Sequence, residues 1–91
     1  MAQTIYTIVT TDYSEHNLGR IKKVSTKSFS DKQTAEDYFR NNIVEKAEKL
    51  YFERDELYIP LGTTHYNLWE DFRDESLDDW FESQIFETTL D

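Results

Sequence analysis

Residues 30–52 read SDKQTAEDYFRNNIVEKAEKLYF, and this stretch decides the fold. Its apolar side chains recur at steps of three and four residues, the period of an amphipathic helix. They are Ala35, Tyr38, Phe39, Ile43, Ala47, Leu50 and Tyr51. Ser30 and Gln33 have the spacing of a capping box, with serine at the N-cap and glutamine three residues later. The pattern predicts a helix over about residues 31–52, packed by one side against a sheet.

Two strands are expected before this helix. Residues 4–11 (TIYTIVTT) are β-branched or aromatic throughout, which is typical of a well-buried strand. Residues 20–29 (RIKKVSTKSF) fit a second and more exposed strand. The polar residues 12–19 between them end in glycine and indicate a connecting loop. We therefore expect a hairpin with a long loop.

The second half of the chain predicts shorter elements. Residues 56–59 and 63–66 are expected to form a hairpin around a turn at Pro60-Leu61-Gly62. A second helix is expected over about residues 68–83, because Asn67 is a good N-cap and apolar residues follow at helical spacing. Ser76 is a candidate break in that helix. Residues 85–90 then fit a final strand.

These elements predict a single domain, residues 1–91, of the α+β class. The expected architecture is a small antiparallel sheet of about three to five strands with two helices, about 31–52 and 68–83. A chain of 91 residues is too short for two independent cores.

Composition restricts the function. The chain has no cysteine, which excludes disulfides and thiolate chemistry. It has no apolar run near the ~20 residues of a membrane span, and the first six residues do not fit a signal peptide. We therefore expect a cytoplasmic protein. A net charge of −9 disfavours direct binding to nucleic acid or to an anionic membrane.

Negative charge is concentrated near the C-terminus. Residues 70–91 hold nine of the 19 acidic residues and a single cation, Arg73. On the predicted helix, the acids lie opposite Trp69, Phe72 and Trp80. The candidate partner-binding residues are Glu70, Asp71, Asp74, Glu75, Asp78, Asp79 and Glu82. Their like-charge pairs would oppose the helix by about 2–4 kcal/mol in total, a cost that a cationic partner would relieve.

The acidic face has three interpretations. Rows of charge about 6 Å apart along a helix approximate the spacing of phosphates on a nucleic-acid strand, which favours a mimic that occupies a basic groove. Alternatively, the acids only solvate the surface. They can also dock on the basic cluster between Arg20 and Lys32, within the monomer or in a homodimer. That cluster is itself typical of an edge strand that discourages edge-to-edge pairing. The aromatic residues of the acidic region are expected in the core, with one or two left as exposed binding anchors. They are Trp69, Phe72, Trp80, Phe81 and Phe86.

Motifs for catalysis or metal binding are missing from the sequence. There is no phosphate-binding glycine loop, no HExxH and no nucleophile elbow. His16 and His65 have no recognisable partner, and Asp74, Asp78 and Asp79 lack the spacing of an EF-hand. We therefore expect no enzyme activity, no metal site and no cofactor.

The strand at Thr4–Thr11, the loop and strand at Arg20–Phe29, the Ser30-capped helix and the acidic run WEDFRDESLDDWFES (69–83) resemble a known class of proteins. These are the small acidic proteins that bacteriophages use against host defence, including anti-restriction and anti-CRISPR DNA mimics. The likeness covers the size and composition of the whole chain. It implies a non-enzymatic inhibitor that blocks a basic nucleic-acid-binding protein, such as a nuclease or effector complex, in the host cytoplasm.

The sequence thus favours an inhibitor that binds a basic protein through its acidic helical face. The main alternative is an adaptor or scaffold domain that binds another protein through a sheet edge or an aromatic patch, with acids that only aid solubility. Salt separates the two, because added NaCl weakens electrostatic binding far more than apolar binding.

Overall fold

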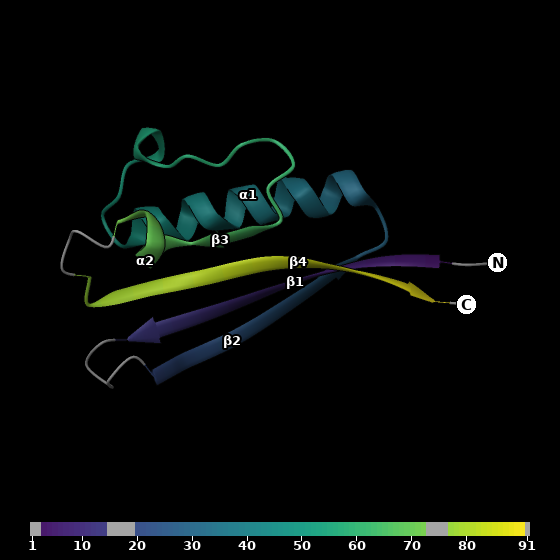
Figure 1. Ribbon diagram of the computed structural model, residues 1–91, viewed down its shortest axis with the longest axis horizontal. Helices are drawn as coiled ribbons and strands as arrows, with labels where there is room; N and C mark the ends of the chain where they lie inside the picture. The colour runs from purple at the N-terminus through teal and green to yellow at the C-terminus, as the bar shows by residue number, and fades with distance from the viewer. Residues whose placement is uncertain (1–2, 15–19, 73–76, 91) are drawn as a thin grey trace.

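An antiparallel sheet of four strands carries one long helix on one of its faces (Figure 1). The computed structural model describes residues 3–14, 20–72 and 77–90. The elements are β1 (Gln3–Ser14), β2 (Arg20–Phe29), α1 (Lys32–Lys49), the 3₁₀ turn η2 (Arg54–Glu56), β3 (His65–Asn67), α2 (Leu68–Asp71) and β4 (Asp79–Leu90). The strand order is β2-β1-β4-β3. The predicted α+β class with a small antiparallel sheet is confirmed.

The first and last strands form the centre of the sheet. β1 pairs with β4 along its whole length, from Gln3 opposite Leu90 to Ser14 opposite Asp79. The β-branched sequence of β1 fits this position between two neighbours. The predicted antiparallel pairing of β1 and β2 is confirmed, with a β-bulge opposite Asp12 and Tyr13. Residues 12–14 of the predicted loop belong to β1, and residues 15–19 lie outside the described residues. β2 and the short β3 are the two edge strands.

Helix α1 confirms the predicted central helix, but a different residue caps it. The N-cap is Asp31, whose carboxylate accepts hydrogen bonds from the Thr34 backbone N–H at 2.9 Å and its hydroxyl at 2.7 Å. These two bonds lower the pKa of Asp31. The predicted capping box with Ser30 is wrong by one residue. At its other end the helix closes with Tyr51 in the left-handed region, at a φ of 70°.

The core lies between α1 and the sheet. Phe39 and Ile43 of α1 meet Ile8 of β1 and Phe81 of β4, and all four side chains are at most 1% exposed. Ala35 and Ala47 occupy the same side of α1 and are also fully buried. Small residues at these positions let the helix approach the sheet closely.

The predicted second helix, 68–83, is wrong beyond its first turn. Helix α2 ends at Asp71, and residues from Asp79 onward belong to β4. Residues 73–76, with the candidate break at Ser76, lie outside the described residues. The physical reason is that β1 offers a full-length strand partner, and pairing with it satisfies the backbone of residues 79–90. A helix there would also carry the repulsion of its acidic side chains.

The predicted hairpin of residues 56–59 and 63–66 is also wrong. Residues 57–59 form no strand, and β3 pairs with β4 instead. The turn at Pro60-Leu61-Gly62 is confirmed, since the Thr63 N–H donates to the Pro60 carbonyl at 3.2 Å. Gly62 has a φ of 86°, a conformation that favours glycine.

Candidate protein-binding surface

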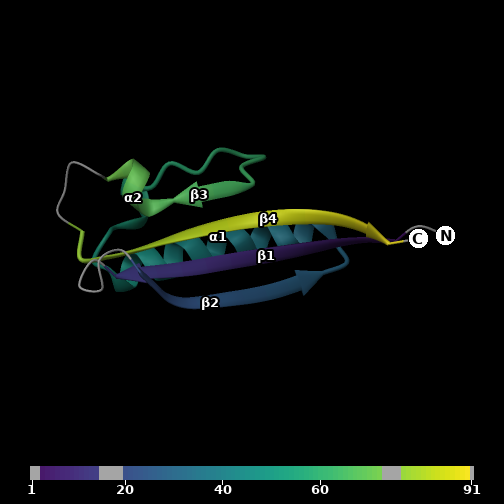
Figure 2. The same cartoon turned by 60° about the horizontal axis from the view of Figure 1, so that its bottom comes forward.

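The two faces of the sheet have different surroundings. Side chains alternate between faces along each strand, and α1 lies over only one face (Figure 2). We call the side under α1 the covered face and the other side the open face. Strand register assigns the open face Gln3, Ile5, Thr7, Val9, Thr11, Tyr13, Ile21, Val24, Thr26, Ser28, His65, Asn67, Trp80, Glu82, Gln84, Phe86, Thr88 and Leu90. Lys22, the extra residue of the β-bulge, belongs to neither set.

Large apolar side chains on the open face are exposed to solvent. Ile21 is 59% exposed, Val24 53%, Phe86 45% and Leu90 50%. They come from two of the four strands, β2 and β4, which lie on either side of β1, so the exposure runs across the sheet. By contrast, Phe81 is 1% exposed although it lies on the same strand as Phe86.

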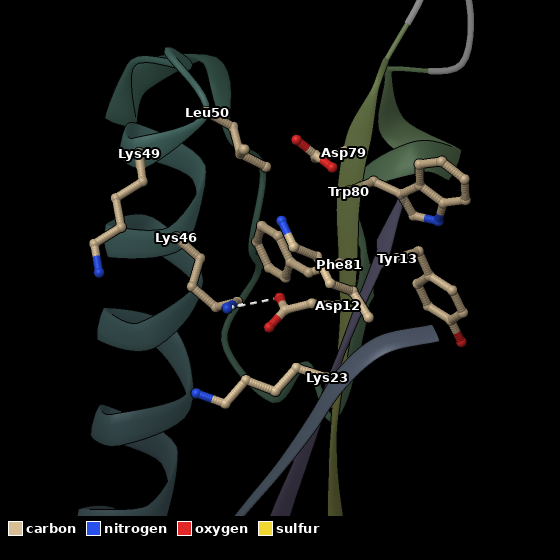
Figure 3. A pocket seen from close by; sticks show the side chains of 10 residues that line it. Asp12, Tyr13, Lys23, Lys46, Lys49, Leu50, Asp79, Trp80 and Phe81 are labelled. Atoms are coloured by element: carbon tan, nitrogen blue, oxygen red, sulfur yellow. Dashed lines mark ion pairs between the residues drawn. The ribbon is translucent and has the colours of Figure 1, made fainter. Parts of the chain in front are cut away.

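An aromatic band crosses one end of the open face. Trp80 of β4 stacks on Tyr13 of β1, with ring centroids 5.6 Å apart and an interplanar angle of 13°. Trp69 of α2 packs against Trp80 at 6.5 Å, and Ile21 is opposite Tyr13 on β2. Figure 3 shows Tyr13 and Trp80 side by side, on the side of β4 away from α1. We call Trp69, Trp80 and Tyr13 the aromatic band; together they present rigid, partly exposed rings.

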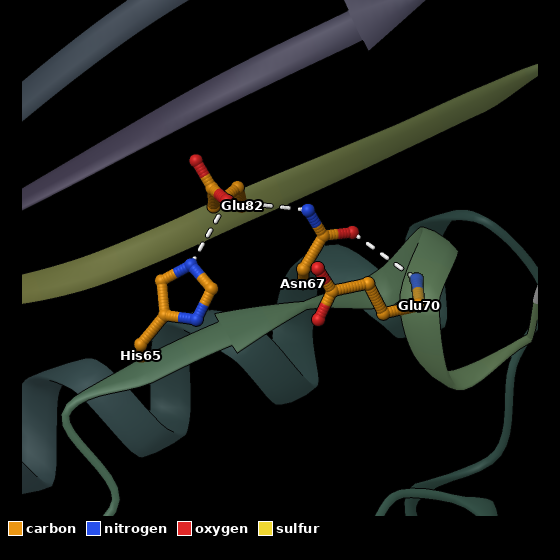
Figure 4. Close-up of polar contacts among 4 residues, drawn as sticks. All are labelled: His65, Asn67, Glu70 and Glu82. Carbon is orange, nitrogen blue, oxygen red and sulfur yellow. Dashed lines mark hydrogen bonds and ion pairs between the residues drawn. The ribbon is translucent and has the colours of Figure 1, made fainter.

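The open face is nearly free of charge. Within the described part of the chain, its one carboxylate is Glu82 and it carries neither lysine nor arginine, although 32% of the whole chain is charged. The Glu82 carboxylate contacts His65 Nε2 at 2.8 Å and accepts from Asn67 Nδ2 at 3.2 Å (Figure 4). Depletion of charge is characteristic of the centre of protein–protein interfaces.

The predicted acidic face does not form. Glu70 and Asp71 are exposed in α2, and Asp78 is exposed just before β4. Asp79 and Glu82 are three residues apart on a strand and therefore point to opposite faces. Asp74 and Glu75 lie outside the described residues. The described acids are distributed over two faces of the sheet and α2, so the prediction of one helical row is wrong.

The neighbourhood of Asp71 shows one consequence of this arrangement. Tyr66 of β3 is 4% exposed and points to the covered side. Burial of its ring raises the pKa of Tyr66 well above the usual value, and the charge of Asp71 raises it further. The charge of Asp71 thus affects the hydroxyl of the core residue Tyr66, and Asp71 does not belong to a row of acidic side chains on one helix.

Where the structure describes both, no ion pair joins the basic cluster to the predicted acidic residues. Among the described residues, the ion pairs join Lys46 to Asp12 at 2.7 Å and His65 to Glu82 at 2.8 Å. Lys23 and Lys27 of β2 instead line hollows beside α1. No ion pair of the described residues joins the cluster to these acids, although Asp79 lines the same hollow as Lys22 and Lys23.

Sequence reasoning missed the open face as a surface. The signal was available in the alternation of Trp80, Glu82, Gln84 and Phe86 with Phe81, Ser83 and Ile85, which has the period of a strand. The helical interpretation placed these two sets on one amphipathic helix and assigned the aromatics mostly to the core.

The described residues contain no group of three or more potential metal ligands. No helix in the described ranges is long and apolar enough to cross a membrane. Comparison of the chain with protein-family models, with curated proteins and with solved structures finds no match in any of the three.

Proposed function

We propose that this chain is a non-enzymatic protein-interaction domain whose open face binds an uncharged, apolar surface of another protein. The observation that carries the proposal is the composition of that face. It exposes Ile21, Val24, Phe86 and Leu90, and the one carboxylate among its described residues is already paired with a histidine. A charged partner gains little from such a surface, whereas an apolar partner gains about 25 cal/mol for each Å² that it removes from water.

Folding alone does not account for this face. The covered face and α1 hold the buried core, and threonine would serve at the exposed strand positions, as it does at Thr26 and Thr88. Exposed aromatic and aliphatic residues beside one another are a cost in the free protein, since they order water without contributing to the core. A partner that covers them recovers that free energy.

The size of the open face suits a stable interface. β1 and β4 have 12 residues each and β2 has 10. With about 3.4 Å per residue and about 4.8 Å between strands, the face measures on the order of 600 Å². Standard interfaces bury about 800 Å² on each partner. The side chains of the face and the neighbouring α2 add area to the flat estimate and bring the total close to this value. The aromatic band supplies rings of the type that dominates binding energy.

The test is a binding comparison with matched variants. The partner is recovered from the source cells with the tagged protein, produced in purified form and titrated by calorimetry. Val24→Lys and Phe86→Lys each place a charge on the open face and should weaken binding by about 30-fold or more. Tyr58→Lys and Leu61→Lys are the controls, because these side chains are 79% and 91% exposed but lie off the sheet. They should leave the affinity unchanged.

Salt provides the second arm of the test. Raising NaCl from about 0.1 to about 0.5 M should change the affinity by less than about threefold, since few charges lie in the interface. The proposal is overturned if the controls weaken binding as much as the open-face variants. It is also overturned if Glu70→Gln, Asp71→Asn and Asp78→Asn together abolish binding and salt weakens it steeply, as a nucleic-acid mimic requires.

A second copy of the chain is one partner that the same variants detect. Light scattering over a concentration series reports self-association of the pure protein. A dimer that Val24→Lys and Phe86→Lys dissociate would support the open face as the binding surface. A dimer that these variants leave intact would place the interface elsewhere and count against the proposal.

A further inference from the structure

β2 is an edge strand with one unpaired side. It is the last strand in the order β2-β1-β4-β3, and in both Figure 1 and Figure 2 no other described element lies along its outer side. Its 10 residues therefore present a row of backbone donors and acceptors. Such an edge is a template for an added strand.

The two sides of β2 have opposite character. Lys23, Ser25 and Lys27 alternate on the side of α1, because they pair with Asp12, Thr10 and Ile8 of the covered face. Val24 and Thr26 alternate on the open face. A strand added to this edge would have its own side chains sorted in the same way, with one set beside the lysines and the other beside Val24.

Two hollows with shared lining residues lie between the β2 side of the sheet and α1. One has a volume of about 230 Å³ and the other of about 190 Å³, and both are lined by Lys23, Lys46 and Lys49. Figure 3 shows Lys23 of β2 and Lys46 of α1 extending into this region from opposite walls. An added strand would therefore find space for side chains here, beside cations from two elements.

Positive charge is concentrated in these hollows. Lys22, Lys23, Lys27, Lys46 and Lys49 line them, which is five of the ten lysine and arginine residues in a chain of net charge −9. Three carboxylates line them as well, those of Asp12, Glu45 and Asp79. The Asp12 carboxylate binds Lys46 at 2.7 Å. The local balance favours an anionic ligand, against the overall charge of the molecule.

We infer that the outer edge of β2 binds an extended acidic segment of another protein, which adds to the sheet as a fifth strand. Acidic side chains at every second position face Lys23 and Lys27, and the apolar side chains between them lie beside Val24. Main-chain hydrogen bonds provide binding energy, and the lysines select the acidic alternation. This site lies along the outer edge of β2 and shares Val24 with the open face, but it binds a different ligand and does not depend on the function proposed above.

The same lysines exclude the simplest alternative occupant, which is β2 of a second copy. Antiparallel pairing of two β2 edges would bring lysines of the two copies together on one face, where like charges are destabilising. Edge lysines thus discourage self-pairing, and they leave the edge open to a strand of opposite charge.

The probe is a capped peptide of about eight residues that alternates glutamate with valine, long enough to span most of β2. Two peptides of the same composition serve as controls. One carries its glutamates and valines in two separate blocks, and the other is N-methylated at alternate residues so that it cannot complete a strand ladder. Titrations of ¹⁵N-labelled protein should shift the amides of β2, with both controls binding at least about tenfold more weakly.

Variants of the protein locate the site. Lys23→Glu and Lys27→Glu should each weaken the alternating peptide about tenfold, and a peptide with lysine in place of glutamate should recover binding to the double variant. Lys32→Glu and Arg54→Glu make the same change of charge away from the edge and should have no effect on the affinity. Circular dichroism confirms that each variant is folded.

Three results would overturn the inference. They are no binding at about 1 mM peptide, equal binding of the N-methylated peptide, and equal losses in the Lys32→Glu or Arg54→Glu controls. None of these results would contradict the open-face proposal, because Val24→Lys and Phe86→Lys are tested with the purified partner protein and not with the peptide.

Discussion

The covered and open faces of this sheet are built from the same strands, yet their large side chains differ in burial. On β4, Phe81 and Ser83 point to α1 and are at most 1% exposed, whereas Trp80, Phe86 and Leu90 point away and remain in contact with solvent. The covered face is explained by stability, because its side chains form the core with α1. The open face has equally large side chains without a layer to cover them. The difference separates residues that hold the fold from residues that are available for binding.

The largest expected difference in the free energy of unfolding is between alanine variants of two phenylalanines of β4. Phe81→Ala removes a fully buried ring and should cost about 3–5 kcal/mol in the free energy of unfolding. Phe86→Ala removes a ring that is 45% exposed and should cost less than about 1 kcal/mol. Urea denaturation of both variants measures the two values. Equal losses would mean that the open face is part of the core and would remove the contrast on which the account depends.

Two hydroxyl pairs give the next comparison. Thr10 and Ser83 share a hydrogen bond of 3.0 Å on the covered face, where both residues are buried. Thr7 and Ser28 share an exposed one of 2.9 Å on the open face. Ser83→Ala should cost about 1–2 kcal/mol, because the buried Thr10 hydroxyl loses a partner that water cannot replace. Ser28→Ala should cost less than about 0.5 kcal/mol. The order of these two costs in thermal or chemical unfolding is the measurement, and a reversed order would contradict the assignment of faces.

The smallest expected difference in the free energy of unfolding concerns the contacts Lys46–Asp12 and His65–Glu82. Lys46 binds Asp12 at 2.7 Å with side chains 25% and 21% exposed, and its ammonium lies 5.7 Å from the centroid of the Phe81 ring. Lys46→Met keeps the apolar stem and should cost about 1 kcal/mol. His65→Ala breaks a more exposed pair on the open face and should cost less than about 0.5 kcal/mol. Unfolding in low and high salt tests both, since screening should remove a larger share of the second cost, where the pair is more exposed, than of the first.

Much of the fold follows from local patterns. The helical period of residues 30–52 predicts α1, and the β-branched run at residues 4–11 predicts β1, because each pattern fits only one kind of element. The cap was misplaced by one residue since Ser30 and Asp31 are both good caps. The carboxylate of Asp31 is the one in reach of the Thr34 N–H.

The identity of β4 depended on a distant partner. Leu77, Trp80 and Phe81 fit a helical period, but Phe81, Ser83 and Ile85 also fit the alternation of a strand. The strand is formed because these residues pair with β1, whose backbone groups lie 65 or more residues away in sequence; Ser14 opposite Asp79 is the pair with the shortest separation. Local propensity does not contain that information.

The candidate site could not be predicted for the same reason. The acidic residues form one face only on a helix, and the pairing of β4 with β1 distributes Asp79 and Glu82 to opposite sides. The open face becomes visible only when strands from both ends of the chain are placed side by side. The sequence did favour, as its main alternative, an adaptor domain that binds through a sheet edge or an aromatic patch. The aromatic band identifies residues for such a patch.

Hydroxyl-radical footprinting of the protein with and without its purified partner tests the central claim most directly. The method measures the solvent contact of individual side chains, and Ile21, Phe86 and Trp69 are exposed enough to react in the free protein. We expect the partner to protect these three side chains, while Tyr51 and Tyr58, which are 96% and 79% exposed off the sheet, keep their reactivity. Protection of the two tyrosines with an unchanged open face would contradict this claim.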